Sequence, residues 1–312
     1  MLSLSKGSPI ATITYKDTKK KPTPIYINDG DDVEKEEKII TSANLDELLP
    51  KSFYTGLKNV NASNMLLLKR AIRLNKNSLL GSGNTLNNAY VLAQELLEEL
   101  SRKYLQVPKN IGKVEIAINE GWQGHISVFG SSGSGKSYWI GKYLMAYKKK
   151  FPKNNIYIFS PIINDLAFAE AKPLYVKIDE TLIDEPLDIK EADFKDSILV
   201  FDDIESLNKP YKQIIESFRD QVLECGRHYG MTAICVSHII LNGQSTKRIL
   251  NESSKIVVFP KSNFSGISNL CRRYFGMGRD DINYIKTVPS RWVCICRNYP
   301  NSLVSENAIK IL

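Results

Sequence analysis

The chain has 312 residues, 43% of them hydrophobic and 24% charged, and its net charge at pH 7 is +8. These values are typical of a globular protein, and the length allows one domain of about 200 residues and a smaller one. No apolar run approaches the roughly 18–20 residues that would span a bilayer. The N-terminal residues lack the apolar core of a signal peptide. We therefore expect a protein that does not insert into membranes.

The sequence of the first 112 residues predicts little regular structure up to residue 60 and helices after it. Residues 1–60 contain a basic, proline-broken stretch and a dense run of mixed charge, so we expect a flexible arm with at most an edge strand at 10–15. Residues 61–112 are expected to form a small, mainly helical region, with helices at 64–75 and 85–106. The second helix has a wide apolar stripe at helical spacing.

From residue 113 onward, apolar strands alternate with amphipathic helices. Strands are predicted at 114–118, 126–129, 156–160, 174–178, 197–202, 231–237, 255–259 and 291–297, and helices at 138–150, 209–225, 267–275 and 280–286. This alternation predicts an α/β fold with a largely parallel sheet between helices. We therefore assign 113–312 to one domain.

A glycine-rich segment follows the strand at 126–129 and fits the Walker A pattern G-x-x-x-x-G-K-[ST] at every fixed position. It comprises Gly130, Ser131, Ser132, Gly133, Ser134, Gly135, Lys136 and Ser137. Backbone N–H groups of such a P-loop surround phosphate oxygens, the lysine reaches the β- and γ-phosphates, and the serine hydroxyl is a ligand for Mg²⁺. We include Tyr138, which opens the next helix, in the candidate nucleotide site. The flanking strand and helix favour an ATP or GTP site over a chance glycine-rich loop.

The strand at 197–202 ends in two carboxylates, as a Walker B strand does. We predict that Asp202 holds Mg²⁺ through water and that Asp203 polarises an attacking water as a general base. Two acids after an apolar run also occur as helix caps or in solvated turns, and it is the upstream P-loop that favours the catalytic interpretation.

Arg227, within Gly-Arg-His-Tyr-Gly, precedes the strand at 231–237, and Ser237 and His238 end it. An arginine at the entrance to a core strand is well placed to neutralise a γ-phosphate bound by a neighbouring subunit. A polar group at the exit, such as His238, would position the water or sense the γ-phosphate. Alternatively, Arg227 is a surface cation and His238 a structural histidine.

The C-terminal half is rich in Lys and Arg, which suits either a polyanion partner or a solvated surface. Its candidate DNA-contacting residues are Lys247, Arg248 and Lys261. All five cysteines lie in this half, at 225, 235, 271, 294 and 296, without the spacing of a zinc site. Cys294 and Cys296 should share one face of a strand by ordinary packing. A reducing, intracellular setting is expected.

These motifs, together with the tail from Ser290 to Pro300, resemble the genome-packaging ATPases of large double-stranded DNA viruses and virophages, a branch of the FtsK/HerA superfamily. The resemblance covers roughly residues 113–312. It implies a RecA-like P-loop ATPase core in which the strand 231–237 lies between the P-loop and Walker B strands. The family usually has glutamine where this chain has His238.

The resemblance also implies ATP and Mg²⁺ as cofactors and a pentameric or hexameric ring that translocates double-stranded DNA into a preformed capsid. Arg227 would then be an arginine finger acting in trans. Capsid vertex proteins would be partners, and the host cytoplasm, a viral factory or the virion the location. Another DNA pump or helicase of the superfamily stays open, and so does a P-loop switch or scaffold that does not translocate. A passive binder, however, would not require Asp203 and Arg227.

Overall fold

The computed structural model describes residues 2–4, 7–27, 103–238 and 243–312. They fall into two compact units, one made of Met1–Glu115 with Asn307–Leu312 and the other of Ile116–Glu306. The division lies close to the boundary predicted at residue 113, except that the last six residues group with the N-terminal unit. Most of the predicted arm and of the predicted helical region falls on residues 28–102, outside the described part.

The described part of the N-terminal unit consists of strands. A four-stranded sheet has the order β1 (Leu2–Ser3), β3 (Thr23–Ile27), β2 (Ser8–Tyr15) and β5 (Gly112–Ile116). Strand β4 (Tyr104–Gln106) pairs antiparallel with β14 (Ala308–Ile311). The expectation of an arm is thus wrong for the described residues up to 27, where alternate side chains such as Ile25 and Ile27 are buried in the sheet. The prediction that a helix reaches residue 106 is wrong at its end, because β4 occupies residues 104–106.

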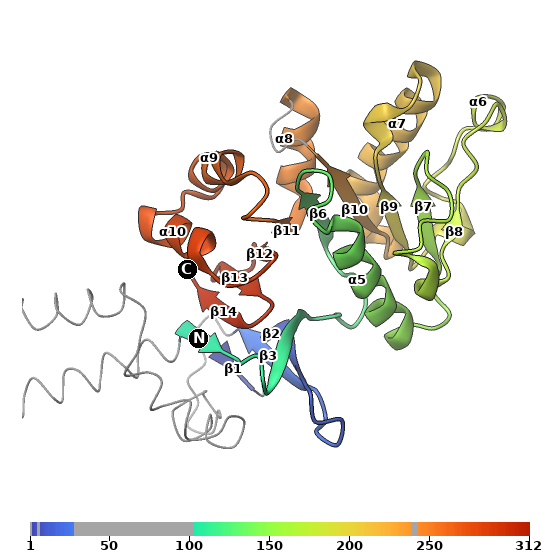
Figure 1. The fold of residues 1–312 in the computed structure, drawn as a ribbon. Coiled ribbons are helices and arrows are strands. Elements are labelled where there is room, and N and C mark those ends of the chain that lie inside the picture. Colours follow the sequence, from blue (N-terminus) through green and yellow to red (C-terminus); the bar gives the residue numbers. More distant parts are fainter. Residues whose placement is uncertain (1, 5–6, 28–102, 239–242) are drawn as a thin grey trace, which may run out of the picture. The chain divides into compact units, whose positions relative to one another are not determined.

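The second unit is built on a mixed sheet, mostly parallel, flanked by helices (Figure 1). Its strand order is β13 (Ser302–Ser305), β12 (Val293–Cys296), β11 (Ser253–Val258), β6 (His125–Phe129), β10 (Thr232–Ser237), β9 (Ile198–Phe201), β7 (Ile156–Phe159) and β8 (Leu174–Tyr175). Only the pairs β11–β12 and β12–β13 in this series are antiparallel. The predicted α/β fold is confirmed, and β10 lies between β6 and β9 as the resemblance implied.

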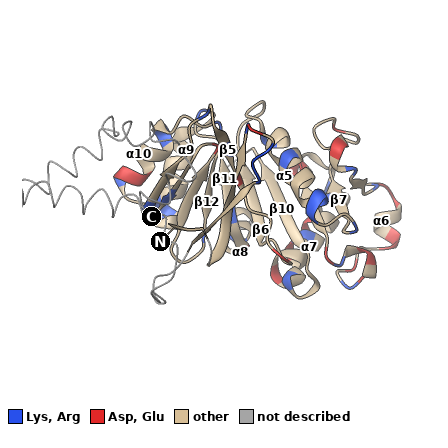
Figure 2. Ribbon diagram, turned by 90° about the horizontal axis from the view of Figure 1, so that it is seen from below, with Lys and Arg blue, Asp and Glu red and all other residues tan. Residues whose placement is uncertain are grey.

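The main helices are α5 (Lys136–Lys150), α7 (Lys209–Cys225), α8 (Gly243–Glu252), α9 (Phe264–Phe275) and α10 (Arg279–Thr287), with one short turn, α6 (Thr181–Asp184). Helix α7 has the predicted bounds and begins with a proline at its first turn, where the missing N–H costs nothing. Helix α8 was not predicted, because its Gly-Gln-Ser-Thr start is typical of a loop. Helices and loops carry many charged side chains, whereas β6, β10 and β12 carry none (Figure 2).

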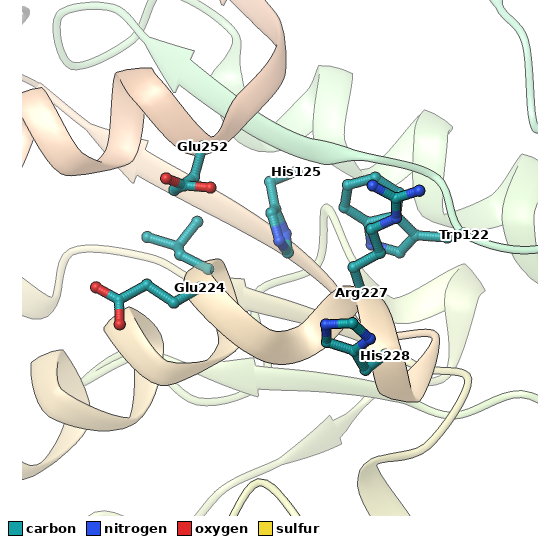
Figure 3. Close-up of a pocket in the computed structure, with 7 residues that line it drawn as sticks. Trp122, His125, Glu224, Arg227, His228 and Glu252 are labelled. Atoms are coloured by element: carbon teal, nitrogen blue, oxygen red, sulfur yellow. The ribbon is translucent and has the colours of Figure 1, made fainter.

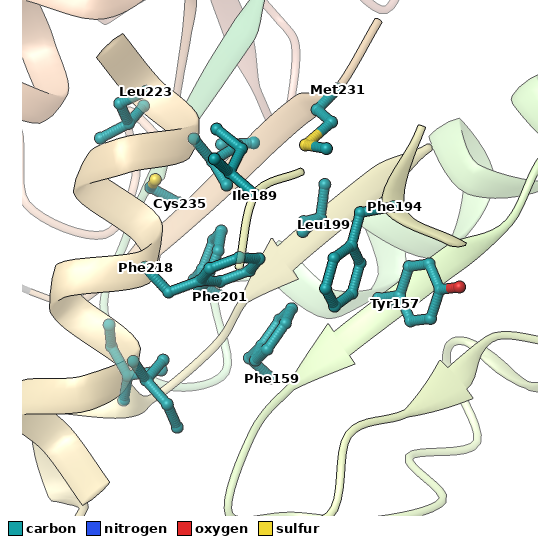
Figure 4. Close-up of a cluster of buried hydrophobic side chains, with 14 of the residues drawn as sticks. Tyr157, Phe159, Ile189, Phe194, Leu199, Phe201, Phe218, Leu223, Met231 and Cys235 are labelled. Atoms are coloured by element: carbon teal, nitrogen blue, oxygen red, sulfur yellow. The ribbon is translucent and has the colours of Figure 1, made fainter. Parts of the chain in front are cut away.

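Aromatic side chains support the strand that carries the two aspartates. Phe218 of α7 is 1% exposed and packs against Phe159, Phe194 and Phe201, with ring centroids 5.5, 5.2 and 6.4 Å away (Figure 4). Phe159 and Phe201 stack on each other across β7 and β9 at 4.8 Å. Because Phe201 immediately precedes Asp202, this cluster sets the position of the carboxylates at the end of β9.

Candidate nucleotide site

The glycine-rich loop connects the buried strand β6 to α5, at the carboxyl edge of the parallel strands. Gly135 caps the helix with a φ of 103°, a left-handed conformation that favours glycine. The Gly130 N–H donates to the Ser237 carbonyl of β10 at 3.3 Å, so the loop is tied to the neighbouring strand. Helix α5 has no acidic residue in its first turn. Its N-terminus therefore presents free N–H groups and a positive dipole, as an anion site requires.

Lys136 is 7% exposed, and its ammonium group is folded back on its own loop. It donates to the carbonyl oxygens of Gly130 at 2.9 Å and Ser131 at 3.2 Å. Burial lowers the pKa of Lys136, and the carboxylates of Asp203, Asp202 and Glu205 oppose that shift. The ammonium therefore occupies a partly desolvated position close to three anions.

The Asp202 carboxyl group is buried at the end of β9. Burial raises its pKa to about 6, the nearby Asp203 carboxylate adds to this, and Lys136 opposes it. An ionised carboxylate here would be stabilised by a divalent cation, and together with the hydroxyl of half-buried Ser137 it makes a set of oxygen ligands suited to Mg²⁺. The residues present fit this ion. The set consists of one carboxylate and one hydroxyl, because within the described ranges no three His, Cys, Asp or Glu side chains are grouped as a metal site of their own.

His238 connects the Walker A and Walker B motifs. Its Nδ1 lies 3.1 Å from the Lys136 Nζ, and its Nε2 lies 2.7 Å from Asp203 Oδ1. Because an ammonium has only donors, Nδ1 accepts, and the ring proton is on Nε2, which donates to Asp203. Asp203 itself has a φ of 52°, uncommon for a residue other than glycine. The structure thus brings Lys136, Asp203 and His238 into one hydrogen-bonded chain.

Glu205 belongs to the same surroundings and was missed in the sequence. Its carboxylate accepts a hydrogen bond from the Ser237 hydroxyl at 3.0 Å. Its position two residues beyond Asp203 was the only local signal, and an acid after a turn is too common to be informative.

A group of large apolar side chains is exposed beside this site. In the segment after β7, Ile162, Ile163 and Leu166 are 56%, 66% and 88% exposed, and Tyr138 is 64% exposed. Asp165, within the same segment, is one of the charges that raise the pKa of Asp202, so the segment lies near the end of β9. Exposed apolar groups of this kind are typical of protein interaction surfaces.

Arg227 lies at the opposite edge of the sheet. It precedes β10, whereas the P-loop follows the parallel strand β6, so the length of β10, about 20 Å, separates it from its own P-loop. The side chain is exposed, and its guanidinium lies over the Trp122 ring, 5.6 Å from the centroid. Gly230, with a φ of 71°, reverses the chain between Arg227 and the strand. The structure therefore brings Arg227 together with neither Lys136 nor Asp203 of the same protomer.

The other residues singled out in the sequence differ in their surroundings. Arg248 is held by Asp220 at 2.5 Å and Glu224 at 3.5 Å, while Lys247 and Lys261 are exposed. The Sγ atoms of Cys294 and Cys296 lie 3.7 Å apart on one buried face of β12. No helix in the described part of the chain is long and apolar enough to cross a membrane.

A curated relative from a virophage shows the family of the chain. Uncharacterized protein V3 of Sputnik virophage is 32% identical over 224 residues, which cover 68% of this chain and 90% of the relative. The chain belongs to the family of this protein. The virophage relative agrees with the resemblance indicated by the motifs. No family model matches the sequence.

Several solved structures align with more than half of this chain. B204, the DNA-packaging ATPase of Sulfolobus turreted icosahedral virus, is 13% identical, with a TM-score of 0.42 over 60% of this chain and 98% of B204. The genome-packaging NTPase B204 of Sulfolobus turreted icosahedral virus 2, in complex with AMPPCP, is 15% identical, with a TM-score of 0.40 over 58% and 97%. The pCW3 conjugation coupling protein TcpA with ATPγS is 14% identical, with a TM-score of 0.42 over 65% of each chain.

Proposed function

We propose that the chain is an ATPase that works as an oligomeric ring and translocates double-stranded DNA, its task being to package a viral genome into a preformed capsid. The observation that carries the proposal is the position of Arg227. An exposed guanidinium at the edge of the sheet opposite to its own P-loop can reach a γ-phosphate only on a neighbouring protomer. A site completed in trans makes hydrolysis depend on assembly, as a motor requires.

Within one protomer, each residue at the carboxyl edge would have a separate role in nucleotide binding or hydrolysis. Lys136 would leave the carbonyls of Gly130 and Ser131 and bind the β- and γ-phosphates. Ser137 and Asp202 would hold Mg²⁺, which neutralises charge on the phosphate oxygens. Asp203 would orient and deprotonate the attacking water, while the His238 Nε2–H keeps its carboxylate in place. Arg227 of the next protomer would stabilise the charge of the transition state.

The exposed apolar residues beside the site support the assembly. Ile162, Ile163 and Leu166 lie on a segment near Asp202, where a neighbour that inserts Arg227 would have to approach. Covering them would remove apolar surface from water and stabilise the contact. Subunit number, pentamer or hexamer, stays a prediction from the sequence resemblance.

The DNA and capsid parts of the proposal depend on the motif resemblance and on membership of a virophage family. Exposed Lys247 and Lys261 are available to contact phosphates, whereas Arg248 is engaged by Asp220 and Glu224. Such contacts would be independent of base sequence and weakened by salt. Capsid vertex proteins would be the docking partners.

The test combines DNA stimulation with subunit mixing. ATP hydrolysis should be faster with double-stranded DNA, and the protein should form rings with an ATP analogue. Arg227→Ala and Asp203→Asn should each be inactive alone. An equimolar mixture should recover activity, because an Arg227→Ala protomer keeps its own Asp203 and receives an intact arginine from its neighbour. A monomeric protein whose hydrolysis ignores DNA would refute the motor and favour a nucleotide switch or scaffold.

A further inference from the structure

Arg227 projects into a cavity at the amino edge of the sheet that no part of the proposed chemistry has so far used. The cavity has a volume of about 560 Å³ and lies between the start of β6, the end of α7 and the end of α8 (Figure 3). Arg227 and Trp122 lie at one end of it, and the acids Glu224 and Glu252 at the other, with His125 between them. No hydrogen bond or ion pair of the Arg227 guanidinium is found among the described residues. Its contact there is the face of the Trp122 ring.

The Trp122 indole is itself fixed on two sides. Its Nε1–H donates to the Met231 carbonyl at 2.7 Å, and Met231 lies four residues beyond Arg227, at the start of β10. The His125 ring meets the indole edge to face, with centroids 5.1 Å apart and an interplanar angle of 81°. His125 is 2% exposed, and its Nδ1 accepts from the Ala233 N–H at 3.0 Å. The indole is thus attached to the same segment that carries the arginine.

From this geometry we propose that Trp122 is a positioning residue for the trans arginine. The inference rests on the proposed function, because it assigns Arg227 its role at the neighbour's γ-phosphate. An exposed arginine samples many rotamers, and ordering it at each encounter would oppose catalysis. The electron-rich indole face holds the guanidinium by a cation–π contact without using its N–H donors. All five donors therefore stay free for phosphate oxygens.

The arrangement also explains why an ion pair would serve worse than a tryptophan here. A carboxylate partner would neutralise the guanidinium and occupy the fork that must bind phosphate. Glu224 and Glu252 line the far end of the cavity, and Glu224 lies near Arg248. The indole leaves the charge of Arg227 intact and restricts only its direction.

The test uses Trp122→Leu and Trp122→Phe in the full-length chain, assayed for ATP hydrolysis alone and in equimolar mixtures. Leucine removes the aromatic face, so the kcat should fall about 10- to 100-fold, the range expected for a mispositioned group, with KM unchanged within about threefold. Phenylalanine keeps a face without the Nε1–H and should retain a kcat within about threefold of wild type. Arg227→Ala, which removes the group itself, should lose about 10³-fold.

Mixtures of variants distinguish a mispositioned Arg227 from a misfolded Trp122→Leu protein. Trp122→Leu should recover activity with Asp203→Asn, which supplies an intact tryptophan and arginine in trans, and should not recover with Arg227→Ala, which has the same defect. Wild-type turnover of Trp122→Leu, or equal losses in the leucine and phenylalanine variants, would overturn the inference and leave the trans arginine standing. So would a Trp122→Leu protein that fails to recover with Asp203→Asn while Arg227→Ala does recover. Wild-type turnover of Arg227→Ala would instead overturn the trans arginine of the proposed function and this inference with it.

Discussion

The contact between His238 and Lys136 must break before the lysine can bind phosphate, so it should weaken nucleotide binding. The His238→Ala variant removes that contact, and we expect it to bind MgADP more tightly than wild type. ADP is the better ligand for this measurement, because it lacks the γ-phosphate that His238 would itself contact. The same variant should hydrolyse ATP about 10²-fold more slowly, since Asp203 loses the Nε2–H donor that orients it.

The size of the effect follows from one hydrogen bond. Bonds to charged groups contribute about 1.5–3 kcal/mol, and the His238 side chain is 40% exposed, so the lower end applies after screening. A contribution of about 1–1.5 kcal/mol corresponds to a roughly 5- to 12-fold lower Kd. The carbonyl contacts of Lys136 with Gly130 and Ser131 persist in the variant and cancel from the comparison.

The matched control is His238→Gln. A glutamine amide can donate to Asp203 and accept from Lys136, so this variant should keep an affinity for MgADP close to that of wild type. Isothermal titration calorimetry on the three proteins measures the Kd values directly. Equal or weaker binding of MgADP by His238→Ala would show that the contact does not oppose nucleotide binding, and the reasoning would fail.

Three further outcomes are expected. Lys136→Ala should lose at least about 10³-fold in turnover, measured as phosphate release, because the variant lacks the ammonium that would bind the β- and γ-phosphates; hydrolysis at the wild-type rate would move the nucleotide site elsewhere. Burial lowers the pKa of His125 from 6.5 to about 4, so the folded state binds fewer protons than the unfolded state between these values, and stability present above pH 6.5 is lost as the pH falls to 4. That loss is at most about 3 kcal/mol. In urea unfolding, the free energy of unfolding should depend less on pH for His125→Asn, whose amide oxygen can still accept from the Ala233 N–H. An unchanged pH dependence would argue against a neutral buried imidazole. Phe218→Ala should destabilise the fold by about 3–5 kcal/mol in urea unfolding and Phe218→Leu by much less, since leucine fills most of the space between the neighbouring rings; equal losses would contradict the packing account.

Local sequence was enough to predict much of the structure at the carboxyl edge of the parallel strands. The strand, glycine loop and helix around Lys136 are contiguous, and apolar periodicity with a proline at the first turn specifies the observed bounds of α7. The alternation of strands and helices was enough for the α/β class, because parallel strands require crossovers of this kind. Local signals failed for β13 and β14, four residues each, and for α8, whose first turn has the composition of a loop. Of the N-terminal strands, β2 and β5 were expected in part, although β2 lies inside its sheet and not at the edge, whereas β1, β3 and β4 were missed because long-range pairing, and not periodicity, stabilises them.

The residues of the candidate site also fall into those that local sequence predicts and those that it does not. Asp202 and Asp203 follow a recognisable strand, so their position at its end was predictable from residue types and order, and their chemistry stays a proposal. Glu205 and Trp122 were not predictable, because nothing in their neighbouring residues marks them. The contact of Trp122 with the Met231 carbonyl joins residues 109 positions apart.

Residue types and their spacing along the chain therefore specify which groups can bind a triphosphate, since those groups lie on one contiguous strand–loop–helix segment. Contacts between side chains of different segments depend on the order of the strands in the sheet. His238 lies against Lys136, 102 residues away, only because β10 is inserted between β6 and β9. The same insertion directs Arg227 to the far edge of the sheet, since a strand parallel to β6 must begin where β6 begins.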